Sequence, residues 1–234
     1  MRKTKSGLEL SSIGEEIVDC RLCSRLVEWR EKVAREKVAR FADQDYWGRP
    51  VPGYGDPDAT LLVVGLAPAA HGGNRTGRIF TGDRSGDWLF ASMHRTGWAS
   101  QPNSVSRDDG LRLLGSYVAA IVRCAPPDNK PTTAERDTCI GYFVRELRAL
   151  TKVTAVVALG SFAWDNFLRA HVELGRARPR PKPKFGHLAE CDLGDYLLIG
   201  SFHPSQQNTF TGKLTEPMLD AVFERARECS RDNV

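Results

Sequence analysis

The chain has 234 residues, of which 41% are hydrophobic and 26% charged, and its formal net charge at pH 7 is +4. This length supports a full hydrophobic core, which excludes a small scaffold held together by disulfides. No run of about 18 apolar residues occurs, so we expect no membrane span. The basic start lacks a following apolar segment, so we expect a cytoplasmic protein with reduced cysteines. The positive charge allows a polyanionic partner without requiring one.

Four short, nearly continuous apolar runs predict β-strands at 60–65, 117–122, 153–159 and 196–201. Strands of this kind are buried on both faces. Helical patterns occur at about 24–43, 85–96, 132–150, 161–173 and 213–229. We therefore predict an α/β fold, a three-layer α/β/α sandwich with a central four-stranded parallel sheet. With no repeat or domain boundary in view, 1–234 is expected to be one domain with an N-terminal helical extension of about residues 1–45.

Four of the six cysteines form a candidate metal centre. Cys20 and Cys23 are a C-x2-C pair, whereas Cys124 follows the second predicted strand and Cys139 lies on the predicted helix that begins near residue 132. Four thiolates suit either zinc or an iron–sulfur cluster, and the spacing does not decide between them. Independently buried thiols are the structural alternative. The remaining two cysteines, Cys191 and Cys229, are expected to be core residues.

A glycine-rich loop, residues 65–86, follows the first predicted strand. It matches neither a phosphate-binding P-loop nor a dinucleotide fingerprint. Its candidate reactive or recognising side chains are His71, Asn74, Arg75, Arg78, Phe80 and Asp83. His203-Pro204 follows the last predicted strand, so both segments should meet at the carboxyl edge of one parallel sheet. This edge is the expected active-site cleft.

Residues 174–187 carry five cations and no acid, and alternate with proline from residue 178 onward. Such a segment should be extended and exposed. It is either a phosphate-contacting surface or a solvated loop.

Three separated motifs, GLAPAAHGGNRTGRIFTGD, VRCAPPDNKPT and HPS, resemble those of the uracil-DNA glycosylase superfamily, in particular its family 5, the UDGb type. The resemblance covers most of the chain and includes the four spaced cysteines. It implies a [4Fe–4S] cluster on Cys20, Cys23, Cys124 and Cys139, with zinc as the alternative cofactor. It also implies a monofunctional DNA repair enzyme that flips uracil out of DNA, cleaves its N-glycosidic bond and leaves an abasic site.

The resemblance also implies roles for residues of the cleft. Phe80 is expected to stack on the flipped base, Asn129 to lie near it, and His203 to hydrogen-bond uracil O2 as negative charge develops. The backbone of the first motif, with Gly65, Ala67 and Ala69, should complete the base-binding site.

The first motif departs from other glycosylase families because it has no ionisable residue between positions 65 and 69. The resemblance assigns the acid to Asp83, which would steer water or balance the cationic sugar. A helix N-cap is the structural alternative for Asp83. The apolar motif implies a wider base range that includes hypoxanthine, hydroxymethyluracil or ethenocytosine.

DNA containing uracil or other deaminated bases is the expected partner of a monomeric protein. Candidate DNA contacts are Arg75, Arg78, Ser205, Gln206 and Asn208, with the basic segment 174–187. A non-catalytic iron–sulfur protein that binds DNA or transfers electrons is the alternative function, motivated by the absent first-motif acid.

Overall fold

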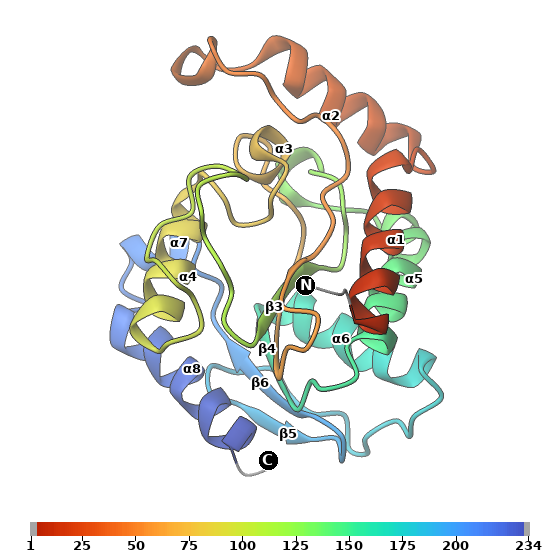
Figure 1. Ribbon diagram of the computed structural model, residues 1–234, viewed down its shortest axis with the longest axis vertical. Helices are drawn as coiled ribbons and strands as arrows, with labels where there is room; N and C mark the ends of the chain where they lie inside the picture. Colours follow the sequence, from red (N-terminus) through yellow and green to blue (C-terminus); the bar gives the residue numbers. More distant parts are fainter. Residues whose placement is uncertain (1–3, 232–234) are drawn as a thin grey trace.

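A computed structural model describes residues 4–231, and its centre is one sheet with the strand order β1-β3-β2-β4-β6-β5 (Figure 1). The strands are β1 (Tyr54–Gly55), β2 (Leu61–Gly65), β3 (Ser116–Ala120), β4 (Ala155–Leu159), β5 (Glu190–Asp192) and β6 (Leu197–Ser201). The four inner strands run parallel, and β1 and β5 pair antiparallel with β3 and β6 at the two edges.

The predicted α/β class and the four parallel strands are confirmed, but the predicted strand number is corrected from four to six. The two additional strands gave no apolar signal in the sequence. β1 has only two residues, and the side chains of β5 are exposed at both ends of the strand. Short polar edge strands of this kind are common because they discourage pairing with another chain.

Helices cover both faces of the sheet (Figure 1). They are α1 (Lys5–Asp19), α2 (Ser24–Glu36), α3 (Gly73–Thr76), α4 (Arg84–Arg95), α5 (Thr133–Ala149), α6 (Ser161–Glu173), α7 (Gln206–Phe210) and α8 (Glu216–Arg231), with the 3-10 turns η1 (Ala39–Phe41) and η2 (Pro127–Asn129). The helix predicted over 24–43 ends early, because Lys37 takes a left-handed backbone conformation with φ 53°. The first three residues of the predicted N-terminal extension lie outside the described residues.

The alternation of side chains along the strands produces two separate cores. In β2, Leu62 and Val64 pack with residues of α5 and α6, whereas Leu61 and Val63 pack with residues of α4 and α8. Successive strand residues point to opposite faces, so a strand covered on both sides must be apolar throughout. This explains the continuous apolar runs and gives the three layers. Among residues 4–231, no helix has the length and apolarity that a bilayer crossing needs.

A buried ion pair joins the end of β3 to α5. Arg123 and Glu146 pair directly, and the side chain of each is only 2% exposed. Glu146 also accepts hydrogen bonds from the Gly53 amide, at 3.2 Å, and from the Tyr117 hydroxyl, at 3.4 Å. One carboxylate therefore fixes strand, helix and the loop before β1 to one another.

Replacing Arg123 with Met should lower the free energy of unfolding by about 3–5 kcal/mol, because Glu146 is then buried without its partner. The double variant Arg123→Met/Glu146→Leu should lose less of its free energy of unfolding, since no unpaired charge remains buried. Urea unfolding at neutral pH measures both. The half-exposed pair Arg145–Glu16 is the control, and Arg145→Ala should cost less than about 1 kcal/mol. A double variant at least as unstable as the single one would contradict this account.

Candidate active site

A pocket of about 250 Å³ opens at the carboxyl ends of β2 and β6. Its walls come from Leu66, Ala67, Ala69, Phe80, Asp83, Ser85, Asn129, His203 and Ser205. Sites for drug-sized ligands have volumes of roughly 300–1,000 Å³, so this pocket suits a smaller group. The glycine-rich loop and the segment after the last strand therefore do meet at one edge of the sheet, as expected.

Phe80 fits over the end of β2 because residue 65 has no side chain. A Cβ at Gly65 would lie 2.7 Å from Cζ of Phe80, which is too close for any other residue type. Phe80 itself has a left-handed backbone, with φ 53°, and is 5% exposed. Its ring centroid lies 5.9 Å from that of His203, and the two rings are inclined by 36°. Two flat rings thus line the pocket.

Asp83 both caps a helix and lines the pocket. Its Oδ1 accepts a hydrogen bond from the Gly86 amide, at 2.9 Å, as the N-cap of α4. A Cβ at Gly72 would lie 2.0 Å from Oδ2, so only glycine allows the loop backbone to approach this carboxylate. Burial raises the pKa of Asp83 above its usual range. Asp83 is therefore an N-cap and a residue of the pocket wall at the same time, so the two interpretations do not exclude each other.

His203 is fixed through its main chain by a neighbour in sequence. The side-chain amide of Asn208 donates to the His203 carbonyl oxygen at 2.8 Å. Burial lowers the pKa of His203 to about 4, so its imidazole is neutral at pH 7. A neutral imidazole can still donate one hydrogen bond. The Asn208 amide nitrogen is thus bonded to the main chain of His203, and the half-buried residue stays a predicted DNA contact.

A second hollow, of about 670 Å³, lies next to the pocket and shares Ala69, Asp83 and Asn129 with it. Asn129 is exposed and has a left-handed backbone with φ 56°, at the end of η2. Gln206 lines this groove, whereas Ser205 lines the pocket itself. The sequence analysis did not single out Leu66 and Ser85 as pocket residues, although both lie in the glycine-rich loop, nor Arg84 and Arg40, which are exposed along the groove. Arg40 stands outside every motif, and the other three carry no signal that separates them from their neighbours in the loop.

Arg75 is buried and bonded within the loop. Its guanidinium donates to the carbonyl oxygens of His71 and Gly82, both at 2.8 Å, and to Oε1 of Gln44 at 2.6 Å. It also stacks on Phe41 at 3.8 Å from the ring centroid. The expected phosphate contact by Arg75 does not fit these bonds, because its three guanidinium nitrogens donate to the loop and to Gln44.

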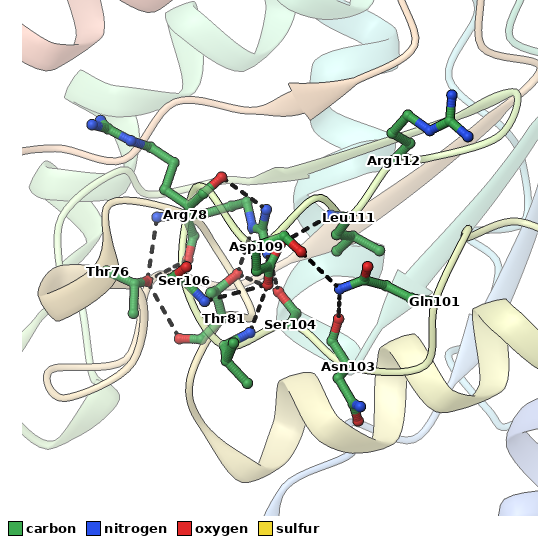
Figure 2. A network of polar contacts seen from close by, with 12 residues as sticks. Thr76, Arg78, Thr81, Gln101, Asn103, Ser104, Ser106, Asp109, Leu111 and Arg112 are labelled. Atoms are coloured by element: carbon green, nitrogen blue, oxygen red, sulfur yellow. Dashed lines mark hydrogen bonds and ion pairs between the residues drawn. The ribbon is translucent and has the colours of Figure 1, made fainter.

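Arg78 is the centre of the network in Figure 2. It forms an ion pair with Asp109 at 2.6 Å, and it donates to the hydroxyls of Ser104 and Thr81 at 2.7 and 2.9 Å. The side chains of Arg78 and Asp109 are 6% and 5% exposed. Arg78 therefore ties the glycine-rich loop to residues 101–112, and its expected role in DNA contact does not fit this burial. No signal in the sequence pointed to Asp109 as its partner.

The basic segment 174–187 is anchored partly at the opposite edge of the sheet. Arg176 pairs with Asp195 at 2.9 Å and stacks on Tyr196 at 4.4 Å, just before β6 begins. Lys182 pairs with Asp165 of α6 at 2.7 Å. Two of the five cations are thus held by acids from other segments, whereas Arg178, Arg180 and Lys184 are exposed.

Cys20, Cys23, Cys124 and Cys139 line a single cavity with Tyr142 and Arg123. Burial raises the pKa of Cys124 to about 11 and that of Cys139 to about 12. Within residues 4–231, no three Cys, His, Asp or Glu side chains converge tightly enough to hold one metal ion. A single zinc ion needs every sulfur at about 2.3 Å. The four thiols therefore share one cavity, and their chemistry is that of a site for a thiolate-bound metal group, whether zinc or an iron–sulfur cluster.

The other two cysteines pack where core residues were expected. Cys191 of β5 lies against the core shared with α5 and α6, and Cys229 of α8 lies against the core on the other face. Both are half-buried. Neither lines the cavity of the four cysteines.

The family model for the uracil DNA glycosylase superfamily matches residues 52–227. A type-5 uracil-DNA glycosylase of Mycobacterium tuberculosis is 54% identical over 211 residues, which cover 89% of this chain and 77% of the relative. Those of Mycobacterium leprae and Thermus thermophilus are 50% and 49% identical, with 94% and 91% of this chain and 95% and 94% of the relatives covered. The chain therefore belongs to the uracil DNA glycosylase superfamily and, within it, to the type-5 family.

Proposed function

We propose that this protein is a monofunctional DNA glycosylase that hydrolyses the bond between uracil and deoxyribose and leaves an abasic site. The observation that carries the proposal is the pocket at the ends of β2 and β6, where an aromatic ring, an amide, an imidazole and a carboxylate line one small cavity. The type-5 relatives are named as uracil-DNA glycosylases, which supports the same reaction.

The pocket suits a base that has left the duplex. A stacked base exposes neither its glycosidic bond nor its Watson–Crick edge to a protein, so the nucleotide must be flipped out first. Phe80 offers the stacking surface, and Gly65, Ala67 and Ala69 leave room beside it. Asn129 carries both a donor and an acceptor with which to bind the edge of the base.

In the proposed reaction the N1–C1′ bond breaks, its electron pair goes to the uracil ring, and water adds to C1′. Neutral His203 donates a hydrogen bond to uracil O2, where negative charge develops. Asp83 orients the water, accepts its proton and balances the cationic sugar. The raised pKa of its carboxyl group suits a base of this kind.

We propose a base range wider than uracil. The first motif contributes only Leu66, Ala67 and Ala69 to the pocket wall, and their side chains form no hydrogen bonds with a base. Selection would then follow the stability of the departing base, so hypoxanthine, hydroxymethyluracil and ethenocytosine are candidate substrates. Apolar contacts discriminate weakly between bases of similar size.

We propose that DNA lies along the groove beside the pocket. Ser205 and Gln206 would contact the backbone, and exposed Arg40 and Arg84 would supply positive charge. Contacts with phosphate groups are independent of sequence and weaken with salt. We also propose that the protein acts as a monomer, because residues of one chain line the whole pocket, and we propose a cytoplasmic location as a separate expectation.

We propose that Cys20, Cys23, Cys124 and Cys139 hold a [4Fe–4S] cluster. Four thiolates bind such a cluster, which can cross-link segments of the chain or carry an electron. Here it would join the N-terminal helices to the segments after β3 and in α5, so that 1–234 acts as one domain. Because burial raises the pKa values of Cys124 and Cys139, metal binding by these two thiols would release protons.

Purified protein should produce alkali-sensitive sites in double-stranded oligonucleotides that carry one uracil, with hypoxanthine cleaved as well and lesion-free DNA left intact. Gel electrophoresis after alkali treatment measures the cleavage. Tight binding to lesion DNA without any cleavage would instead favour the alternative, a non-catalytic iron–sulfur protein that binds DNA.

Asp83→Ser and His203→Gln should each lower the single-turnover rate at least ~100-fold. Serine keeps an N-cap for α4 while it removes the carboxylate, so this variant separates chemistry from helix capping. Equilibrium binding to lesion DNA should change little. Activity near the wild-type level in Asp83→Ser would remove Asp83 from the catalytic residues.

Cys139→Ser should abolish visible absorbance and iron content and should destabilise the fold, because a ligand is lost. Cys191→Ser is the matched control, since Cys191 lies outside the cavity. Absorbance spectroscopy with iron analysis gives the result. A Cys139→Ser protein with wild-type iron would exclude Cys139 as a ligand, and zinc in place of iron would favour the alternative cofactor.

The free energy of unfolding should fall as pH drops from about 6.5 towards 4, in part because of His203. In this window the unfolded chain protonates this histidine, whereas burial lowers its folded-state pKa from 6.5 to about 4. Urea unfolding at about pH 5 and pH 7 should show a smaller pH dependence for His203→Gln than for wild type. Identical pH dependence in the two proteins would show that His203 is not desolvated.

A further inference from the structure

Arg30 of α2 is a fully buried cation that no step of the proposed reaction uses. It is 2% exposed, and its Nη1 donates to Sγ of Cys124 at 2.9 Å. Its Nη2 donates to the carbonyl oxygen of Cys20 at 3.1 Å. One guanidinium thus joins both segments that supply cysteines, Cys20 before α2 and Cys124 after β3.

The main chain of Arg30 contacts the glycine-rich loop. Its carbonyl oxygen accepts a hydrogen bond from Nδ2 of Asn74, at 3.2 Å, and Asn74 is 0% exposed in α3. α2 and α3 lie beside each other (Figure 1). The carbonyl oxygens of Asn74 and Arg75 accept the amides of Gly48 and Trp47, at 3.0 and 2.8 Å. The N-terminal segment is therefore bonded to the loop by both side chain and main chain.

α3 lies inside the loop that forms the pocket. Gly72, just before this helix, lies against the carboxylate of Asp83, and Ala69 receives hydrogen bonds from the amides of Gly72 and Asn74. A displacement of α3 would therefore move both Ala69 and the backbone beside Asp83. Arg30, Asn74 and the short helix α3 thus form a continuous connection from the cysteine segments to the pocket.

We propose that Arg30 is a positioning residue that couples the cysteine centre to the glycine-rich loop. Its charged hydrogen bonds fix α2 to Cys20 and Cys124, and its carbonyl oxygen in turn holds Asn74 of α3, the helix that follows Gly72. A charge-assisted bond in a buried setting is stronger than one between neutral groups, and its loss leaves a buried partner unsatisfied. A change at the cysteine segments should therefore loosen the glycine-rich loop, and a change in the loop should loosen the cysteine segments.

Each variant changes one of the two regions, the cysteine segments or the glycine-rich loop, and the measurement is made on the other region. Arg30→Met removes the bonds to the cysteine segments, and amide hydrogen exchange across residues 72–78 should become at least ~10-fold faster. Asn74→Ala touches no cysteine, and a chelator should remove iron from this variant several-fold faster than from wild type. Single-turnover glycosylase rates should fall in both variants with little change in the affinity for uracil DNA.

Lys32→Gln is the matched control because Lys32 lies on the same helix and its side chain, 53% exposed, pairs with exposed Glu36 at 3.9 Å. It should leave loop exchange and iron release at wild-type values. If Arg30→Met does not fold, Arg30→Lys keeps the charge with fewer donors and is measured in the same way. Wild-type exchange in the Arg30 variant, or wild-type iron release in Asn74→Ala, would overturn the proposal.

The iron measurement rests on the proposed cluster, whereas the exchange measurement does not. Wild-type protein without iron would contradict the cluster and leave the exchange result readable. Faster loop exchange in Arg30→Met would then still establish that Arg30 holds the loop.

Discussion

The buried ion pair between Arg78 and Asp109 is the interaction on which the pocket depends. Burying either charge without its partner would cost much free energy, because the charge would lose its hydration. The pair is stable in the interior because the surrounding hydroxyls and amides satisfy its remaining hydrogen bonds. Asp109 accepts the amides of Val105 and Leu111 while it pairs with Arg78, at 2.8 and 3.0 Å. These bonds select one path for the loop, and Phe80 follows two residues later in a backbone conformation that side chains rarely adopt. The position of the pocket ring is thus set by charges that lie outside the pocket.

Much of the fold could be predicted because the strands are covered on both faces and so must be apolar along their whole length. The antiparallel edges could not, since two residues in β1 and the exposed ends of β5 carry no such pattern. The meeting of Phe80, Asp83 and His203 at one edge follows from parallel strand direction, which is a property of topology that local sequence already indicates.

The arginines show where prediction from sequence fails. A cation in a glycine-rich loop has the same appearance whether it faces phosphate or an internal acid, and Arg78 finds its acid in a segment with no detectable pattern. The sequence also leaves the N-cap and pocket interpretations of Asp83 as alternatives. A residue type alone does not show that Oδ1 of this carboxylate accepts the Gly86 amide while Oδ2 lies against Gly72. The roles of Arg78 and Asp83 both depend on residues that the fold brings close to them, and these contacts exist only in the folded chain.

The position of β6 has a consequence for the order in which the protein becomes competent. This strand pairs with β4 on one side and β5 on the other, and the segment that leaves it carries His203. During synthesis, the chain up to α6 contains the glycine-rich loop, the four cysteines and three parallel strands, yet lacks one wall of the pocket. A chain that ends after α6 therefore already contains all four cysteines and the glycine-rich loop, yet it has no closed pocket for a base until β6 and His203 are added.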